Sequence, residues 1–138
     1  MLTAYSDASV CEKGTAGTAI LLQDDMFIDY ALETFYGTSN SGRSELLAVI
    51  LAARLVDRNF DTPQEVIIYS DCLTLVNRSK KCLGRSYLPD WWAYKSDWRR
   101  LMEIAEKHHI TIEYVKSHQS ERSYNMICDF AARRLARR

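Results

Sequence analysis

The stretch Val66-Ile67-Ile68-Tyr69-Ser70-Asp71 decides the fold that the sequence predicts. An uninterrupted run of apolar and aromatic residues, without polar alternation, is typical of a strand whose sheet is covered on both faces. The run ends at Ser70-Asp71, and ligand sites of such sheets gather where the carboxyl ends of the strands meet the loops. The sequence therefore predicts an α/β fold with Asp71 at a candidate site.

Three strands are predicted upstream of this stretch. They cover Leu2–Asp7, Thr18–Leu22 and Met26–Phe35, and turn signals at Gly14–Gly17 and Asp24–Asp25 separate them. Consecutive strands with short connections pair with their neighbours, so we expect an antiparallel meander.

Helices are predicted on either side of the deciding stretch. Ser39–Gly42 offers helix-start residues, and apolar residues follow at helical spacing to about Arg58, so Glu45 is expected in the first turn. A second helical segment begins near Leu73 and leads into the basic stretch Arg78–Arg85.

The remaining elements complete a mixed sheet. Apolar residues spaced by three or four predict a helix from Trp91 to about His108, alternation predicts a fifth strand over Ile110–Tyr114, and a last helix is expected over about Glu121–Arg137. Hairpins followed by alternating helices and strands predict five strands, three antiparallel and two parallel, with helices on both faces. No linker or repeat divides residues 1–138, so we expect a single domain.

Composition restricts the class of protein. A chain of 138 residues with 47% apolar and 26% charged residues is typical of one ordinary domain, and its core needs no metal or disulfide. The longest apolar runs fall far short of the roughly 18 residues that a membrane helix requires. The four cysteines include no C-x-x-C pair, and the N-terminus lacks a signal peptide's pattern. We expect a cytoplasmic monomer with reduced thiols and no membrane partner.

Charge is unevenly distributed along the chain although the formal total is zero. Residues 1–77 carry a net charge of −7, residues 78–100 carry +5 and residues 101–138 carry +2. An acidic half followed by a basic segment suits a protein that binds cations beside a polyanion. Ordinary solvated surface charge explains the same asymmetry if it is taken alone.

Four acidic residues fall where the predicted elements converge. They are Asp7, Glu45, Asp71 and Asp129. Each has an ordinary structural explanation: aspartate is common at strand ends, glutamate is favourable near a helix N-terminus, and Asp129 stands four residues before Arg133. Taken one by one, the four residues do not decide between these structural roles and a shared functional site.

Five motifs taken together resemble those of type 1 ribonuclease H. Three surround the first three acids: Tyr5-Ser6-Asp7-Ala8-Ser9, Ser44-Glu45-Leu46-Leu47-Ala48 and Tyr69-Ser70-Asp71-Cys72. The other two, Val115-Lys116-Ser117-His118 and Asn125 to Ala131, are similar to the family's histidine loop and fourth acidic motif. Chain order and approximate spacing match over nearly the whole chain, which implies the ribonuclease H-like fold.

The resemblance implies a catalytic set of Asp7, Glu45, Asp71 and Asp129 with His118 assisting. Hard carboxylate oxygens suit Mg²⁺, and paired divalent ions about 4 Å apart suit phosphodiester hydrolysis. We therefore expect two Mg²⁺ ions, with Mn²⁺ as an alternative, and we expect the RNA strand of an RNA/DNA hybrid to be cut to 3′-hydroxyl and 5′-phosphate ends.

The other two histidines have no place in these motifs. His108 and His109 stand at the end of the helix predicted from Trp91. We expect both to be ordinary solvent-facing residues.

Substrate contacts are expected from two groups of residues. The motif positions imply Ser9, Asn40, Ser41, Arg43 and Asn125. A second group interleaves cations with an aromatic residue, a pattern that suits phosphates and bases. Its members are Arg78, Lys80, Lys81, Arg85 and Trp92.

The sequence also departs from the family pattern. Ala8 replaces the common Gly after the first Asp, a Gly-Asn-Pro-Gly-like loop is absent, and Cys72, which we expect to be a packed thiol, replaces the commoner Ser. Two alternatives therefore stay open: a DNA nuclease of the same fold, and a non-catalytic module that binds the hybrid.

Overall fold

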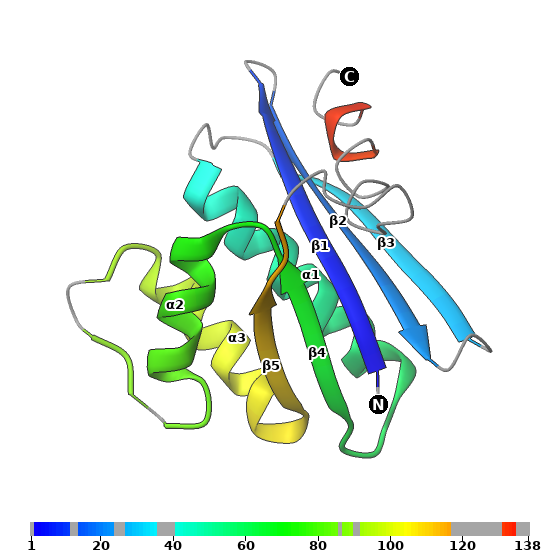
Figure 1. The fold of residues 1–138 in the computed structure, drawn as a ribbon, viewed down its shortest axis with the longest axis vertical. Helices are drawn as coiled ribbons and strands as arrows, with labels where there is room; N and C mark the ends of the chain where they lie inside the picture. The colour runs from blue at the N-terminus through cyan, green and yellow to red at the C-terminus, as the bar shows by residue number, and fades with distance from the viewer. Residues whose placement is uncertain are drawn as a thin grey trace.

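A five-stranded mixed sheet forms the centre of the computed structural model, which describes residues 2–11, 14–23, 27–35, 41–85, 87–89, 92–116 and 131–134. The sheet order is β3-β2-β1-β4-β5 (Figure 1). Strands β1, β2 and β3 are antiparallel, whereas β4 runs parallel to β1 and β5 parallel to β4, as predicted. The strands are β1 (Leu2–Cys11), β2 (Gly14–Gln23), β3 (Phe27–Phe35), β4 (Glu65–Ser70) and β5 (His109–Tyr114).

The hairpin of β1 and β2 is longer than predicted. Its ladder runs from Leu2 opposite Gln23 to Cys11 opposite Gly14. The prediction of a turn over Gly14–Gly17 was therefore wrong, because cross-strand pairing outweighs the turn preference of glycine. As a result Asp7 lies inside a strand, opposite Thr18, and the ladder fixes its backbone.

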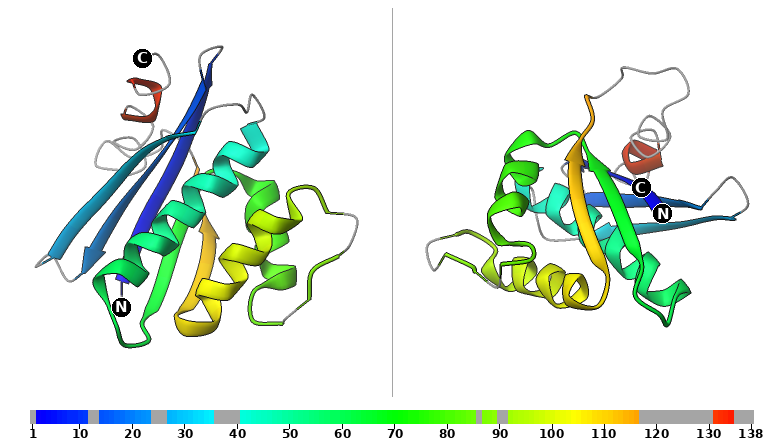
Figure 2. Two further views of the ribbon diagram at one scale, coloured as in Figure 1. Left: turned by 180° about the vertical axis from the view of Figure 1, so that it is seen from behind. Right: turned by 60° about the horizontal axis from the view of Figure 1, so that its bottom comes forward.

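Within the described part of the chain, three helices cover one face of the sheet, and residues 131–134 lie against the other face (Figures 1 and 2). The helices are α1 (Ser41–Asn59), α2 (Leu73–Cys82) and α3 (Lys95–Lys107). Between residues 46 and 56 of α1 only Arg54 is exposed, because α1 packs against both the sheet and α3. None of the helices in these described ranges combines the length and the apolar character that a membrane crossing requires.

Helix α3 begins later than the predicted start at Trp91. Tyr94 adopts the left-handed conformation with φ of 59°, so helical geometry starts only at Lys95. From there the predicted apolar face is confirmed, with Trp98 and Leu101 buried in the core.

His108 contradicts its predicted position in solvent. Of the two histidines at the end of α3, only His109 is exposed, and His108 is completely buried. The backbone N–H of Gln64 donates a hydrogen bond to His108 Nδ1 at 3.1 Å, and His108 Nε2 lies 3.0 Å from Asp57 Oδ1. These two polar partners make the burial of the ring possible.

Candidate active site

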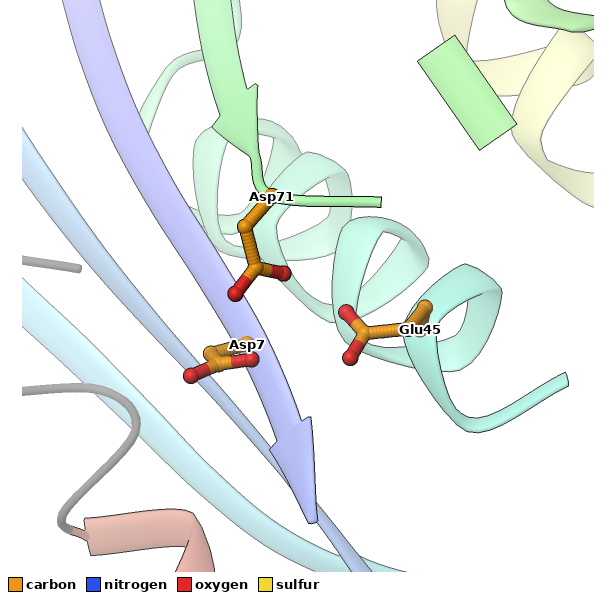
Figure 3. Close-up of side chains that lie close together, drawn as sticks. All are labelled: Asp7, Glu45 and Asp71. Carbon is orange, nitrogen blue, oxygen red and sulfur yellow. The ribbon is translucent and has the colours of Figure 1, made fainter. Parts of the chain in front are cut away.

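Three of the predicted acids converge at the centre of the sheet. Asp7 comes from β1, Asp71 follows the end of the neighbouring strand β4, and Glu45 comes from α1, which crosses behind both strands (Figure 3). Each residue offers a carboxylate oxygen, and these oxygens all lie within 4.8 Å of one another. The strand order brings Asp7 and Asp71 together although they are 64 positions apart in sequence, because β1 lies beside β4 and Asp71 directly follows β4.

The cluster is poorly solvated. Asp7 is 2% exposed, and Glu45 and Asp71 are half-buried. Asp7 Oδ1 accepts a hydrogen bond from the Ala8 amide at 2.9 Å. The other oxygen, Asp7 Oδ2, and Glu45 Oε2 are buried atoms for which the described residues supply no hydrogen-bond donor. Three carboxylates this close repel one another unless a cation or protons neutralise them.

The structure also weakens the ordinary explanation for Glu45. Helix α1 begins at Ser41, so its first turn contains no acidic residue and Glu45 lies in the second. The helix dipole acts mainly on the first turn. The position of Glu45 is therefore better explained by its approach to Asp7 and Asp71 than by capping of α1.

Several predicted site residues lie outside the described residues. These are His118, Asp129, Asn40 and Asn125, and their assignment stays a prediction. Ser9 lies in β1 beyond Asp7, and Ser41 is the first residue of α1. Both therefore belong to the two segments that carry Asp7 and Glu45.

Cys72 follows Asp71 and precedes the first residue of α2. Burial raises the pKa of its thiol, and the charges of Glu45 and Asp71 raise it further. A thiol in this environment stays protonated at neutral pH and is a poor nucleophile. This agrees with the predicted role of Cys72 as a packed thiol.

Sequence reasoning missed how the first and third acidic motifs pack together. The rings of Tyr5 and Tyr69 stack with centroids 5.2 Å apart and an interplanar angle of 23°. Ser6 and Ser70, which follow them, are fully buried. The signal was available, because Tyr-Ser-Asp occurs twice, at residues 5–7 and at residues 69–71.

Arg43 also has a partner that the sequence did not indicate. Its Nε lies 3.2 Å from Oδ2 of Asp97, a carboxylate that is 8% exposed in the first turn of α3. The Arg43 guanidinium also lies 5.9 Å from the centroid of the Tyr94 ring. These contacts connect the start of α1 to the start of α3, and the Arg43 side chain remains 39% exposed.

The basic segment lies on and after α2, and the prediction that Trp92 contacts the substrate is contradicted by its burial. Trp92 is 5% exposed and packs against Trp98 with centroids 5.3 Å apart. Its ring is covered by the guanidinium of Arg78, 5.4 Å from the centroid. Hydrophobic burial outweighs stacking on a substrate here. The other members of the segment, Lys80, Lys81 and Arg85, are exposed.

This combination of fold and carboxylate cluster defines an α/β protein whose central site suits divalent cations. The RNase H family model matches residues 1–137. The chain therefore belongs to the RNase H family of ribonucleases.

Individual relatives agree with this assignment. A ribonuclease H of Chlorobium phaeobacteroides (strain BS1) is 28% identical over 142 residues, which cover 95% of this chain and 92% of the relative. Among solved structures, the N-terminal RNase H domain of a Mycobacterium tuberculosis protein has a TM-score of 0.77 at 13% identity, covering 99% of this chain and 93% of that one. LC11-RNase H1, solved in complex with an RNA/DNA hybrid, has a TM-score of 0.74 at 11% identity and covers 97% and 98% of the two chains. At these identities the solved structures establish the ribonuclease H fold.

Proposed function

We propose that this protein is an endonuclease that hydrolyses the RNA strand of RNA/DNA hybrids with the help of two divalent cations. The observation that carries the proposal is the convergence of Asp7, Glu45 and Asp71, whose carboxylate oxygens lie within 4.8 Å of one another. Membership of the RNase H family supports the choice of substrate.

The residues of the cluster fit Mg²⁺. Mg²⁺ prefers carboxylate oxygens and water, and it binds through a few protein ligands while substrate phosphate completes its shell. Asp7, Glu45 and Asp71 supply such oxygens, and Asp129 is the fourth ligand that the family motif implies. Mn²⁺ accepts the same ligands. When bound, two such ions would neutralise the charge that builds on the attacking and leaving oxygens.

The chain's own groups have distinct roles in this proposal. Asp7 and Asp71 would hold both ions, Glu45 would act on the substrate side, and Asp129 would act on the side of the attacking water, as the family motifs imply. His118 takes up or releases a proton at a ring nitrogen, for which its ordinary pKa of about 6.5 is suited. Water attacks the phosphorus, the bond from phosphorus to O3′ breaks, and O3′ gains a proton. The products carry 3′-hydroxyl and 5′-phosphate ends.

Substrate binding is assigned to residues around this centre. We assign ribose and phosphate contacts to Ser9, Asn40, Ser41, Arg43 and Asn125, and contacts with the DNA strand to the exposed cations of the basic segment. Trp92 contributes indirectly, because its buried ring supports Arg78. We also propose that residues 1–138 act as one domain, as a monomer and in the cytoplasm.

One assay separates this proposal from its alternatives. The purified protein is incubated with Mg²⁺ and labelled RNA/DNA hybrid, RNA duplex, DNA duplex and single strands. We expect cleavage of the hybrid's RNA strand alone. Cleavage of duplex DNA would identify a DNA nuclease of the same fold, and tight hybrid binding without cleavage would identify a non-catalytic module.

A pair of variants assigns the activity to the cluster. Asp71→Asn should reduce cleavage below detection while hybrid binding and the circular dichroism spectrum are retained. Asp61→Asn is the matched control, because Asp61 is exposed in the connection between α1 and β4. Wild-type cleavage by Asp71→Asn would refute the assigned site.

A further inference from the structure

The repeated tripeptide Tyr-Ser-Asp occupies equivalent positions on two adjacent strands. Strands β1 and β4 lie side by side and pair in parallel (Figure 1). Their register places Tyr5 opposite Tyr69. The described ladder between the two strands ends at this pair. Asp7 and Asp71 each follow two residues later, where the backbone ladder of β1 and β4 no longer fixes their separation.

The two tyrosine rings stack immediately before these aspartates. Their centroids are 5.2 Å apart, close to the spacing of about 4.8 Å between neighbouring strands, so the rings stack nearly flat across the strand pair. Since side chains alternate along a strand, Tyr5 and Asp7 project to the same side of β1. The stack therefore lies on the same side of β1 as the Asp7 side chain.

Buried serines hold the same two segments from the opposite face. The Ser6 hydroxyl donates to the Tyr69 carbonyl at 3.3 Å and so connects β1 to β4. Ser70 Oγ accepts a hydrogen bond from the backbone N–H of Cys72 at 3.2 Å, and the Ser70 carbonyl accepts one from the backbone N–H of Val115 at 2.9 Å. The serines connect the backbones of these segments, and the tyrosine stack packs the side chains of β1 and β4 together immediately before Asp7 and Asp71.

We propose that the stacked pair of Tyr5 and Tyr69 is a spacer that sets the separation of Asp7 and Asp71 and thereby favours Mg²⁺ over larger divalent cations. This inference rests on the proposed metal site. Mg²⁺ demands near-ideal octahedral geometry with short bonds, so a small change in carboxylate spacing weakens it strongly. Mn²⁺ has longer bonds and a more tolerant shell. Tyr5 and Tyr69 act as positioning residues, and this positioning depends on their aromatic rings rather than on their hydroxyl groups.

The test compares metal binding of ring-deleting and ring-retaining variants. The metal-free protein, residues 1–138, is titrated calorimetrically with MgCl₂ and, separately, with MnCl₂, at a temperature where circular dichroism shows every variant folded. Tyr69→Ala should weaken Mg²⁺ binding about tenfold, the scale seen when groups that orient metal ligands are removed. Mn²⁺ binding should change less than about threefold, so the ratio of the two dissociation constants shifts.

Three further variants make the result specific. Tyr69→Phe keeps the stack and should retain the wild-type ratio. Tyr69→Leu keeps apolar volume without a ring and should behave like Tyr69→Ala, which secures the test if the alanine variant does not fold. Tyr114→Ala is the matched control, since Tyr114 pairs with Ser70 in the β4–β5 register and therefore projects from the opposite face to Tyr69.

Each outcome has a defined meaning. A selective loss of Mg²⁺ affinity in the Ala and Leu variants, with wild-type behaviour of Tyr69→Phe and Tyr114→Ala, supports the spacer. Folded Ala and Leu variants with an unchanged ratio, or with equal losses for both metals, would overturn it and leave the proposed nuclease intact. If the wild-type chain binds neither metal, with or without a hybrid present, the proposed function itself fails.

Discussion

Asp7 is the residue at which burial and charge act against each other most strongly. It is 2% exposed and lies beside two further carboxylates, so the metal-free protein contains unfavourable repulsion. Asp7→Asn removes one charge, and its amide oxygen retains an acceptor for the Ala8 N–H. We expect this variant to be more stable than wild type in EDTA by about 1–4 kcal/mol, the range between a charge pair about 4 to 5 Å apart in bulk water and the same pair near a protein surface.

The same variant should lose its response to metal. Ligands that bind only the folded state raise its stability, so Mg²⁺ should increase the free energy of unfolding of wild type and have little effect on Asp7→Asn. Urea unfolding in EDTA and in Mg²⁺ measures both effects. A destabilised Asp7→Asn in EDTA would show that Asp7 is a structural residue rather than part of a cation site.

The sequence predicted the identities of the clustered residues but not their contacts. Asp7, Glu45 and Asp71 were identified because their motifs resemble a family with a known chain order. The partner of Arg43 could not be predicted, because Asp97 is 54 residues away and no local pattern relates the two. Burial of Trp92 was equally unpredictable, since the indole suits a core and a binding surface alike.

At the scale of elements, His108 connects three segments at the amino ends of the parallel strands. Its ring accepts a hydrogen bond from the backbone N–H of Gln64, just before β4, and contacts Asp57 near the end of α1. In the chain, His108 directly follows the last residue of α3. Since Nδ1 accepts, Nε2 carries the hydrogen and donates to Asp57.

Removal of this ring should be costly. His108→Ala leaves the Gln64 N–H without its acceptor and creates a cavity, for which we expect a loss of about 2–4 kcal/mol in the free energy of unfolding. His109→Ala, at the exposed neighbouring position, should lie within about 0.5 kcal/mol of wild type. Urea unfolding of the two variants measures the difference, and equal stabilities would contradict a structural role for His108.

Asp57 adds a pH dependence to the same junction. Hydrogen bonds from Lys107 and His108 lower the pKa of Asp57 below its ordinary value of 3.8. A carboxylate whose pKa is lower in the folded state stabilises the fold above its unfolded pKa, and this stabilisation disappears as the pH falls through the folded value. The contribution is therefore complete at neutral pH and is lost below about pH 4.

Asp57→Asn tests this assignment. The variant should be less stable than wild type at neutral pH, and the difference should shrink as the pH falls below about 4. Urea unfolding from about pH 7 to about pH 2.5 measures the two curves, with Asp61→Asn as the exposed control. Parallel curves for wild type and Asp57→Asn over the whole range would rule out this contribution.

The boundaries of elements show where local sequence signals were insufficient. The fifth strand was predicted within one residue of its observed limits because alternation is a local property. The start of α3 was missed because the left-handed conformation of Tyr94 is not encoded by a glycine or a proline. The glycines at residues 14 and 17 were assigned to a turn because only the register with β1 reveals them as strand residues.

At the scale of the whole molecule, charge separation should govern substrate binding. The basic segment on α2 carries exposed cations, whereas the carboxylates gather at the sheet centre. Phosphate contacts release counterions, so hybrid binding should weaken steeply with salt. Measuring the dissociation constant of Asp71→Asn for the hybrid at several salt concentrations gives this slope without cleavage.

Removing single cations from the basic segment should flatten that slope. For Lys80→Ala, Lys81→Ala and Arg85→Ala we expect the slope of log K against log salt to fall by about 0.7 to 0.9 for each phosphate that is no longer neutralised. Arg54→Ala is the control, because Arg54 lies on α1 and pairs with Glu33 of the edge strand β3 at 3.8 Å. Unchanged slopes in all three lysine and arginine variants would remove the segment from the substrate interface.

The sequence by itself determined the class of fold and the residue types of the site. Hydrophobic runs and periodicities are local properties, so they can be identified without knowing which distant residues touch. They specified the five strands, the long helices and their order along the chain. Motif order then identified the acids that belong together.

Only the tertiary structure decided which of these residues touch. Strand order placed β1 beside β4. This placement brought Asp7 close to Asp71 and stacked Tyr5 on Tyr69. It also buried Ser6 and Ser70. Contacts of this kind depend on register and on packing between segments that are far apart along the chain. No local pattern carries that information, because it exists only once the chain has folded.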